Sequence, residues 1–170
     1  MEQVRQPKWQ ELDEFPDYAV NDKGEVANIK TGMPRKTSIN QHGIVKISLY
    51  KNSRELYTLS VARLVAEAFV EGKTEFFNTP IHLDGDRENC RADNLMWRPR
   101  WFAVQYHRQF ESDVFHHMDV HIVDVETGKE FYSVKDACMH FGLYYNDVYR
   151  SYIHGEPTRF MRREFELVEE

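Results

Sequence analysis

The stretch IHLDGDRENCRADNLMW, Ile81–Trp97, gathers side chains that could together cleave a phosphodiester bond. It holds one histidine, His82, and four acidic side chains before its second asparagine, Asn94. Phosphodiester hydrolysis needs a base that activates water and a cation that stabilises the anionic transition state. Histidine suits the first task because its pKa lies near working pH, and carboxylates suit the second because Mg²⁺ prefers oxygen ligands. The stretch therefore predicts a hydrolytic metal site, a degenerate form of one, or a loop that only turns the chain.

A second histidine could face the first from a helix. Pro99 suits the first turn of a helix, and the segment RWFAVQYHRQF that follows can be helical. His107 lies in that segment, and the alternative is a half-exposed helix histidine without a ligand. Trp97 and Trp101 are expected to pack in the core. We therefore expect a strand ending near His82, a loop, and a helix that carries His107.

The segments before the stretch predict a small antiparallel β-unit followed by one helix. In GIVKISLYK, Val45, Ile47 and Leu49 alternate with polar residues, which is the period of a half-buried strand. The turn NDKG separates two earlier strand-like runs. An amphipathic helix is predicted over VARLVAEAFV, with Ser60 as its N-cap. These elements must position the acidic loop.

The last fifty residues form a separate pattern. VHIVDVETGKEFYSV predicts two strands joined by a Thr-Gly turn, and SVKDACMHFGLYYNDVYRSYIHG predicts two helices separated by Gly142. Ser133 is expected to cap the first helix, with Asp136 three residues further on. Arg150 lies on the second helix, where a recognition helix would need a few basic and polar side chains. The pattern is typical of a helix-turn-helix unit.

Composition sets wide limits on the class of protein. The chain has 170 residues, of which 41% are hydrophobic, and this fits one globular domain or several small modules. No apolar run approaches the length of a membrane span, and the first residues lack the order of a secretory signal. The two cysteines, Cys90 and Cys138, lie far apart, which favours a reduced, intracellular compartment.

The charge is unevenly distributed along the chain. The formal net charge is −6, but 16 basic and 15 acidic side chains precede Glu111, whereas 6 basic and 13 acidic side chains follow from there. A nucleic-acid surface needs local positive charge rather than a basic average. Two groups of basic residues are candidates for DNA contact: Lys30, Arg35 and Lys36, and Arg98, Arg100 and Arg108. The alternatives are a solvated face and, for Arg98 and Arg100, salt links to the acidic loop.

HLDGDRENCRADNLMW resembles the HNH motif of phage homing endonucleases, which have a ββα-metal, or His-Me finger, site. The segment WQELDEFPDYAVNDKGEVANIKTG resembles the β-rich modular DNA-binding motif that often precedes such domains. The segment HIVDVETGKEFYSVKDACMHFGL resembles the helix-turn-helix motif that often follows them. The three resemblances cover nearly the whole chain in the usual order of the family.

The resemblance implies roles for particular residues. His82 matches the general base, and Asn94 matches the central asparagine that steadies the loop of that base. Asp84 matches the turn after the base and could be a metal ligand, as could His107, because some His-Me nucleases have a metal-binding histidine at that helical position.

Two positions depart from the pattern of the family. Ile81 stands where the family usually has a metal ligand before the base, and Ala103 stands where the helix often supplies a second ligand. These departures leave two alternatives. One is metal-dependent nicking of duplex DNA with Mg²⁺ or Mn²⁺, and the other is an inactive HNH-fold protein that regulates or inhibits by binding DNA or protein.

The resemblance also implies an α+β fold of three units. They are an N-terminal antiparallel β-unit over residues 1–58, an HNH ββα-metal unit over 59–110 and, after a linker at 111–118, a β-hairpin with a helix-turn-helix over 119–170. Duplex DNA is the expected partner, and the acidic C-terminal module could also bind a phage or host protein. The expected location is the cytoplasm, that of the host cell if a phage encodes the protein.

Overall fold

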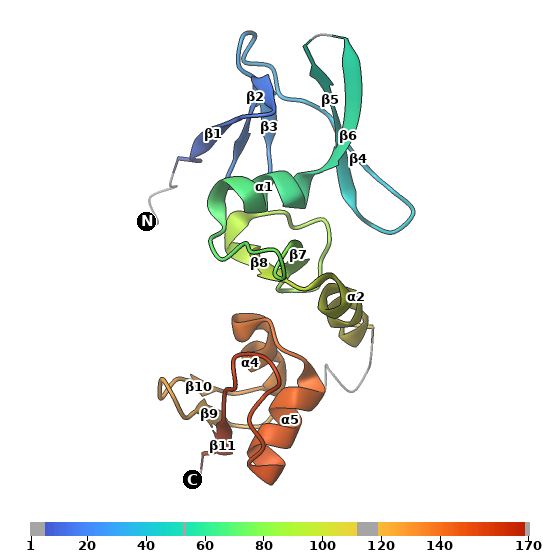
Figure 1. The fold of residues 1–170 in the computed structure, drawn as a ribbon. Coiled ribbons are helices and arrows are strands. Elements are labelled where there is room, and N and C mark those ends of the chain that lie inside the picture. The colour runs from blue at the N-terminus through green and yellow to red at the C-terminus, as the bar shows by residue number, and fades with distance from the viewer. Residues whose placement is uncertain (1–5, 53, 112–118, 169–170) are drawn as a thin grey trace. The chain divides into compact units, whose positions relative to one another are not determined.

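The computed structural model describes residues 6–52, 54–111 and 119–168, and residues 112–118 of the predicted linker lie outside this set. Contacts divide the chain into two compact units, Met1–His82 with Asp86–Arg100, and Leu83–Gly85 with Trp101–Glu170. The described residues form four α-helices and several small antiparallel sheets, so the predicted α+β class is confirmed (Figure 1). No helix in the described ranges is long and apolar enough to cross a membrane.

Two three-stranded antiparallel sheets occupy the N-terminal part of the first unit. The first has the order β1-β2-β3, with the strands Trp9–Leu12, Phe15–Asn21 and Val26–Asn28. The second has the order β4-β5-β6, with the strands Thr37–Ile39, Val45–Lys51 and Glu55–Ser60. The predicted alternation holds in β5, where Ile47 and Leu49 are buried and Lys46 and Ser48 are partly exposed.

One helix organises the core of the first unit. Helix α1, Val61–Phe69, contacts strands of both N-terminal sheets and also the strands β7 and β8 described below (Figure 1). Its inner face buries Val61, Leu64 and Val65, as its apolar spacing predicted. Burial of one such side chain contributes about 1.5–3 kcal/mol, so this stripe helps to hold the sheets on the helix.

Ser60 occupies the N-cap position of α1 in extended backbone, but its side chain makes no capping hydrogen bond. The predicted position of the cap is thus right, and the expected bond is missing.

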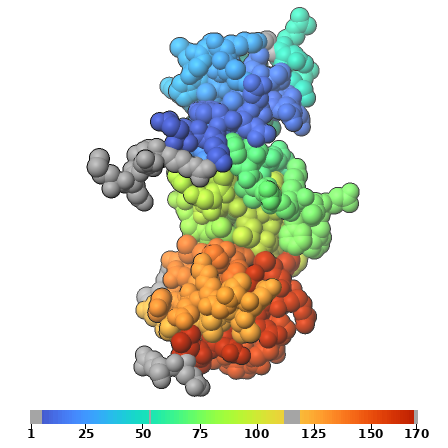
Figure 2. Space-filling model, turned by 90° about the vertical axis from the view of Figure 1, so that its left-hand side faces the viewer, coloured from blue at the N-terminus to red at the C-terminus, as the bar shows by residue number. Residues whose placement is uncertain are grey.

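After the helix, the indole Nε1 of Trp97 donates to the Val70 carbonyl at 2.9 Å and ties the chain back to the core. In the space-filling view, the blue N-terminal residues and the green residues that follow them form one continuous surface (Figure 2).

The stretch Ile81–Trp97 folds as a two-stranded antiparallel ribbon with a loop between its strands. Strand β7, Thr79–His82, pairs with β8, Leu95–Arg98, and the 3₁₀ helix η1, Ala92–Asn94, leads into β8. The register places His82 opposite Leu95. His82 is therefore the last residue of its strand, as expected, and the acidic loop begins directly after it.

The second unit contains α2, Arg100–Gln109, from Trp101 onward, and a compact C-terminal part. Strands β9, Ile122–Asp124, β10, Glu130–Phe131, and β11, Phe165–Leu167, form an antiparallel sheet of order β10-β9-β11. The third strand, β11, was not expected from the sequence. Helices α4, Val134–Phe141, and α5, Tyr145–His154, pack against each other and bury Ile122, Leu143 and Val148 with the sheet.

Local signals set the ends of these two helices. The Ser133 hydroxyl accepts a hydrogen bond from the Asp136 amide at 3.0 Å, which confirms the predicted cap. Gly142 ends α4 in the left-handed conformation with φ 58°, which glycine adopts without a steric penalty. The helix, glycine turn and helix predicted from the sequence are therefore present.

Candidate nuclease site

His82 is held in a buried position at the end of β7. The residue is 6% exposed, and its Nε2 lies 3.9 Å from the Cys90 sulfur across the loop. Burial raises the pKa of the Cys90 thiol to about 11, so this neighbour stays neutral at physiological pH. The thiol sulfur is also 3.7 Å from the Arg87 carbonyl oxygen. One contact of the imidazole is therefore with a neutral thiol.

The loop after His82 is organised by short-range bonds and by Asn94. The Asp86 carboxylate accepts from the Glu88 amide at 2.9 Å, and the Asn94 side-chain amide donates to the Asn89 carbonyl at 2.8 Å. Asn94 is 9% exposed. Because a buried amide bonded to a backbone carbonyl fixes the chain locally, Asn94 holds the loop in one shape.

The segment 83–85 packs on α2 within the second unit. The Tyr106 hydroxyl donates to the Leu83 carbonyl at 2.8 Å. A Cβ at Gly85 would lie 2.3 Å from the Phe110 ring, and its φ is 80°. Only glycine fits here, since a side chain would collide with the ring and would also strain the backbone. Tyr106 on α2 and Phe110, which directly follows this helix, fix the turn that carries Asp84, a role that the sequence did not predict.

His107 lies on the same helix with a defined tautomer. Its Nδ1 is 2.9 Å from the Ala103 carbonyl oxygen. A carbonyl only accepts hydrogen bonds, so Nδ1 carries a proton and donates it to this bond. A metal-binding histidine usually has its other ring nitrogen bonded to an acceptor in this way. Ala103, which cannot be a side-chain ligand, thus orients the histidine one turn further along the helix.

A divalent cation fits this donor set only as a sparsely liganded ion. Among the described residues, no group of three or more His, Cys, Asp or Glu side chains is arranged to hold a metal. Asp84 and His107 both belong to the second unit and supply one carboxylate and one imidazole. Mg²⁺ often takes one or two protein ligands and completes its shell with water and substrate phosphate, so a cation held by this chemistry would depend on both.

The arginines after the stretch differ in exposure. Arg98 is only 5% exposed, and its guanidinium donates to the Trp97 carbonyl at 2.8 Å. Arg100 and Arg108 are exposed. Burial makes Arg98 a structural residue first, whereas the other two can reach a phosphate.

The expectation that both tryptophans pack in the core is half right. Trp97 is 2% exposed, but Trp101 is 52% exposed. On α2 the buried face belongs to Phe102 and Tyr106, which are one turn apart. Trp101 precedes Phe102 by one residue, so its side chain points about 100° away from that face.

A basic groove runs along one face of the sheet β4-β5-β6. It is lined by three basic residues, Arg35, Lys36 and Lys46, and by hydroxyl-bearing residues that include Ser48, and no acidic residue lines it. Arg35 is held in place because its guanidinium donates to the Ser48 carbonyl at 3.3 Å. Lys46 and Ser48 alternate with the buried residues of β5, so they face away from the core. The sequence predicted Arg35 and Lys36 but not Lys46, although the alternation in GIVKISLYK carries the signal.

Other predicted basic residues are engaged in ion pairs. Lys30 pairs with Asp17 at 2.6 Å, and Arg150 on α5 pairs with Glu156. The outer face of α5 also has Asn146 exposed and Tyr149 half-buried. This face is therefore polar and aromatic more than it is positively charged.

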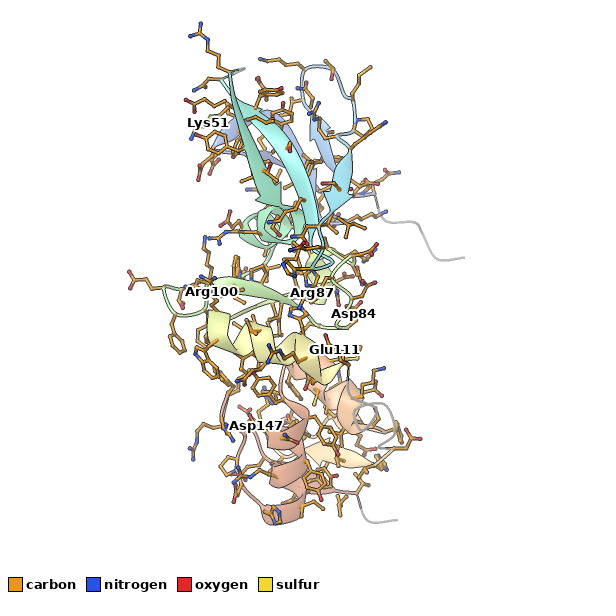
Figure 3. All side chains as sticks on the ribbon, turned by 90° about the vertical axis from the view of Figure 1, so that its right-hand side faces the viewer. Lys51, Asp84, Arg87, Arg100, Glu111 and Asp147 are labelled. Carbon is orange, nitrogen blue, oxygen red and sulfur yellow. The ribbon has the colours of Figure 1, made fainter. Side chains whose placement is uncertain are left out.

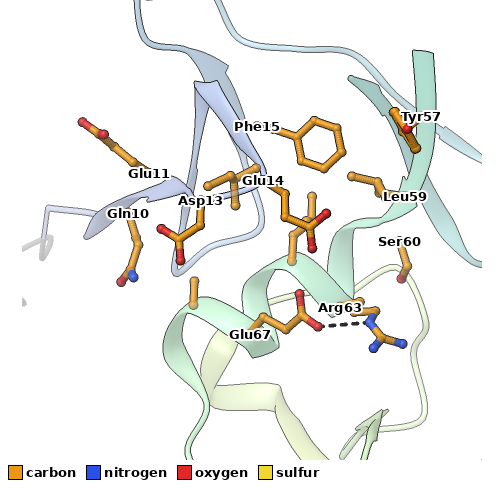
Figure 4. A pocket seen from close by; sticks show the side chains of 13 residues that line it. Gln10, Glu11, Asp13, Glu14, Phe15, Tyr57, Leu59, Ser60, Arg63 and Glu67 are labelled. Atoms are coloured by element: carbon orange, nitrogen blue, oxygen red, sulfur yellow. Dashed lines mark hydrogen bonds and ion pairs between the residues drawn. The ribbon is translucent and has the colours of Figure 1, made fainter. Parts of the chain in front are cut away.

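The first unit also has an acidic pocket of about 420 Å³ where β1, β2, β6 and α1 meet (Figure 4). Glu11, Asp13, Glu14 and Glu67 line it above an apolar floor, and Glu67 pairs with Arg63 at 3.1 Å. Its charge repels phosphate, so it is no part of a nucleic-acid surface.

The chain is similar in sequence to two curated endonucleases. The chain is 34% identical over 90 residues to an uncharacterised HNH endonuclease, L245, of Acanthamoeba polyphaga mimivirus; the match covers 53% of this chain and 26% of the relative. It is 35% identical over 91 residues to the DNA endonuclease I-HmuI of Bacillus phage SP01, covering 53% of this chain and 51% of the relative. The chain thus spans about half of these curated relatives, or less. No family model matches it.

A solved structure described as DNA binding and cleavage by the HNH homing endonuclease I-HmuI is similar over nearly the full chain. The match has a TM-score of 0.54 and 26% identity, and it covers 96% of this chain and 99% of the other. The resemblance to HNH homing endonucleases that the sequence suggested is therefore confirmed.

Proposed function

We propose that this protein nicks duplex DNA in a reaction that depends on a divalent cation. The observation that carries the proposal is His82 at the end of β7, beside a loop that Asn94 holds, in a chain similar to I-HmuI. A buried histidine at a strand end is by itself an ordinary structural residue. The ordered loop and the relatives are what favour a base.

In the proposed reaction, His82 removes a proton from water, and the hydroxide attacks the phosphorus of the scissile phosphate. The bond from phosphorus to the leaving ester oxygen breaks, and that oxygen takes up a proton from solvent. Asn94 contributes by keeping the loop in place and does not itself react. A cation, Mg²⁺ or Mn²⁺, would be held by Asp84 and His107 together with substrate phosphate, and it would supply charge stabilisation to the transition state. The His107 tautomer, with Nδ1 bonded to the Ala103 carbonyl, supports that assignment.

DNA would be bound by the modules that precede and follow the HNH unit in the sequence. We assign residues 1–58 to a β-rich DNA-binding module, residues 59–110 to the HNH unit and residues 119–170 to a helix-turn-helix module. The groove of Arg35, Lys36 and Lys46 supports the first assignment, because it joins positive charge to hydroxyl donors without an acidic neighbour. Arg100 and Arg108 are exposed and suited to phosphate contacts near the site.

The test is nicking of supercoiled plasmid by the wild type and by His82→Ala, with Mg²⁺, with Mn²⁺ and with EDTA. We expect nicking that requires metal and falls by about 10²–10⁴-fold in the variant, the usual contribution of a general base. His121→Ala is the matched control, since His121 lies on the C-terminal module and pairs with Glu130. Equal nicking by His82→Ala and the wild type would contradict the role of His82.

A second candidate is an inactive HNH-fold protein that binds DNA, or a protein, as a regulator or inhibitor. Ile81 favours it, because HNH endonucleases usually have a metal ligand directly before the base, and isoleucine has no atom that can bind a metal. The Ile81 side chain is instead fully buried, with 0% exposure. The same experiment separates the two. If the wild type binds duplex DNA but nicks it with neither metal, the second candidate is right.

A further inference from the structure

The tip of the hairpin between β4 and β5 is bonded to the loop that follows His82. The Arg87 guanidinium Nη1 donates to the His42 carbonyl at 3.0 Å, although the two residues are 45 positions apart. The stem of Arg87 also packs beside Gly43, where a Cβ would lie 3.8 Å from Cδ. Within the first unit, Arg87 lies at the opposite end of the β5–β6 strands from Lys51 (Figure 3).

The hairpin end of this link is closed by its own hydrogen bonds. The Asn40 side-chain oxygen accepts from the His42 amide at 2.9 Å and from the Ile44 amide at 3.0 Å. The Gly43 amide also donates to the Asn40 carbonyl at 2.9 Å. Because the tip is closed by its own hydrogen bonds, a contact to the His42 carbonyl fixes the whole end of the hairpin.

The loop end of the link is ordered as well, and it leads to His82. The Arg87 carbonyl contacts the Cys90 sulfur, which in turn lies 3.9 Å from Nε2 of His82. Asn94 holds the same loop through the Asn89 carbonyl. The segment from Arg87 to Cys90 thus contacts the hairpin tip through Arg87 and the His82 ring through Cys90.

The hairpin belongs to the sheet that bears the basic groove. Strand β5 carries both Lys46 and Ser48 of the groove and begins at Val45, directly after the tip. Helix α1 packs on both the sheet and the β7–β8 ribbon, and the bond from Arg87 to the tip adds a direct link between the sheet and the loop of His82. This link bears on the distance from a phosphate in the groove to that loop. A reacting group misplaced by about 1 Å can cost on the order of 10²-fold in rate.

We infer that Arg87 is a positioning residue that couples the DNA-binding sheet to the base, and so determines which phosphate is cut. The inference rests on the proposed nuclease function. The simpler role for an arginine in this loop is a direct phosphate contact. That role predicts weaker binding without any change in the position of the cut.

The experiment uses the full chain and a duplex selected by wild-type binding from a random pool. Arg87→Ala and Arg87→Lys are compared with the wild type for dissociation constant, single-turnover nicking rate and nick position at nucleotide resolution. Arg91→Ala is the matched control, because Arg91 lies in the same loop but pairs with Asp93 at 2.8 Å. Thermal unfolding of each variant is the check that the fold is kept.

We expect Arg87→Ala to bind with a dissociation constant within about threefold of the wild type, to nick about 10- to 100-fold more slowly and to cut neighbouring phosphates as well. Arg87→Lys keeps a donor of similar reach and should restore the single position. Arg91→Ala should cut as the wild type does. Two results would overturn the inference: nicking by Arg87→Ala at the wild-type rate and position, or a parallel loss of binding and rate at an unchanged position.

A wild type that nicks nothing would refute the proposed function but leave the coupling open to measurement. Hydroxyl-radical footprints of the wild type and Arg87→Ala on the same duplex then decide it. The coupling predicts that the variant keeps part of the protected region and loses its sharp boundary at one end. Identical footprints would contradict it.

Discussion

The two ends of the chain use their basic residues in different ways. The N-terminal groove is lined by Arg35, Lys36 and Lys46 and by no acidic residue. The Arg35 guanidinium donates to the Ser48 carbonyl, and no carboxylate that lines the groove neutralises its charge. In the C-terminal module three of the four arginines pair with carboxylates of the same module: Arg150 with Glu156, Arg159 with Asp147, and Arg163 with both Asp124 and Glu126.

The difference shows that a count of basic residues does not locate a phosphate surface. Arg163 has a side chain only 12% exposed, lies 2.7 Å from the fully buried Asp124, and stacks 4.0 Å from the centre of the Phe141 ring. Such an arginine belongs to the core. We therefore expect the N-terminal groove to supply the salt-dependent part of DNA affinity, and α5 to supply polar and aromatic contacts.

The largest expected effect is on stability, from Arg163→Ala. Removing this guanidinium leaves Asp124 as an uncompensated buried charge, which typically costs about 3–5 kcal/mol. The loss in the free energy of unfolding is measured by urea unfolding, with hydrogen exchange of the α4 and α5 amides as the readout. Arg162→Ala changes the exposed neighbour and should leave unfolding unaltered. If both variants unfold alike, Arg163 does not have this structural role.

The second effect is on DNA affinity and its salt dependence. Lys36→Ala combined with Lys46→Ala should weaken binding about tenfold and reduce the slope of log K against log salt by about 2, as expected for two lost phosphate contacts. Arg150→Ala should change the slope little, because Glu156 already neutralises that charge. Binding titrations at several salt concentrations test both. A larger slope change for Arg150→Ala than for the lysine pair would reverse the comparison.

The third effect compares the serines at the start of a helix in each unit. Ser133→Ala removes a bond of 3.0 Å to the Asp136 amide and should lower the free energy of unfolding by about 1 kcal/mol. Ser60→Ala removes no capping bond, so its cost should be clearly smaller. Denaturant unfolding of the two variants decides whether cap geometry, rather than residue type, sets the cost.

The smallest effect is a pH dependence in the C-terminal module. Burial raises the pKa of Asp147, and the nearby Arg159 only partly offsets this. A raised carboxyl pKa means that the folded state loses stability as pH rises from the unfolded pKa through the folded one. Asp147→Asn should therefore raise the free energy of unfolding at pH 7 by under about 1 kcal/mol and have less effect at pH 3. A larger gain at pH 3 than at pH 7 would contradict the sign.

Much of the local structure followed from the sequence because its causes are local. Apolar alternation in β5, the stripe of α1, the Ser133 cap and the left-handed Gly142 each depend on residues a few positions apart. The motif around His82 also lies within one short stretch, so the order of its residues is enough to show the resemblance to HNH endonucleases. Strand β11 escaped prediction, since its three residues acquire a partner only through β9.

The sequence by itself supplied the candidates for base, loop support and metal ligand, because they lie in one stretch that resembles the HNH motif and in the helix after it. Only the tertiary structure decided which of the candidate residues are available. It showed that Arg98 is buried, that Arg150 is paired and that Lys46 joins the basic groove. It also joined Arg87 to a carbonyl 45 residues away. Such contacts depend on how distant segments pack, which the spacing of residues along the chain does not encode.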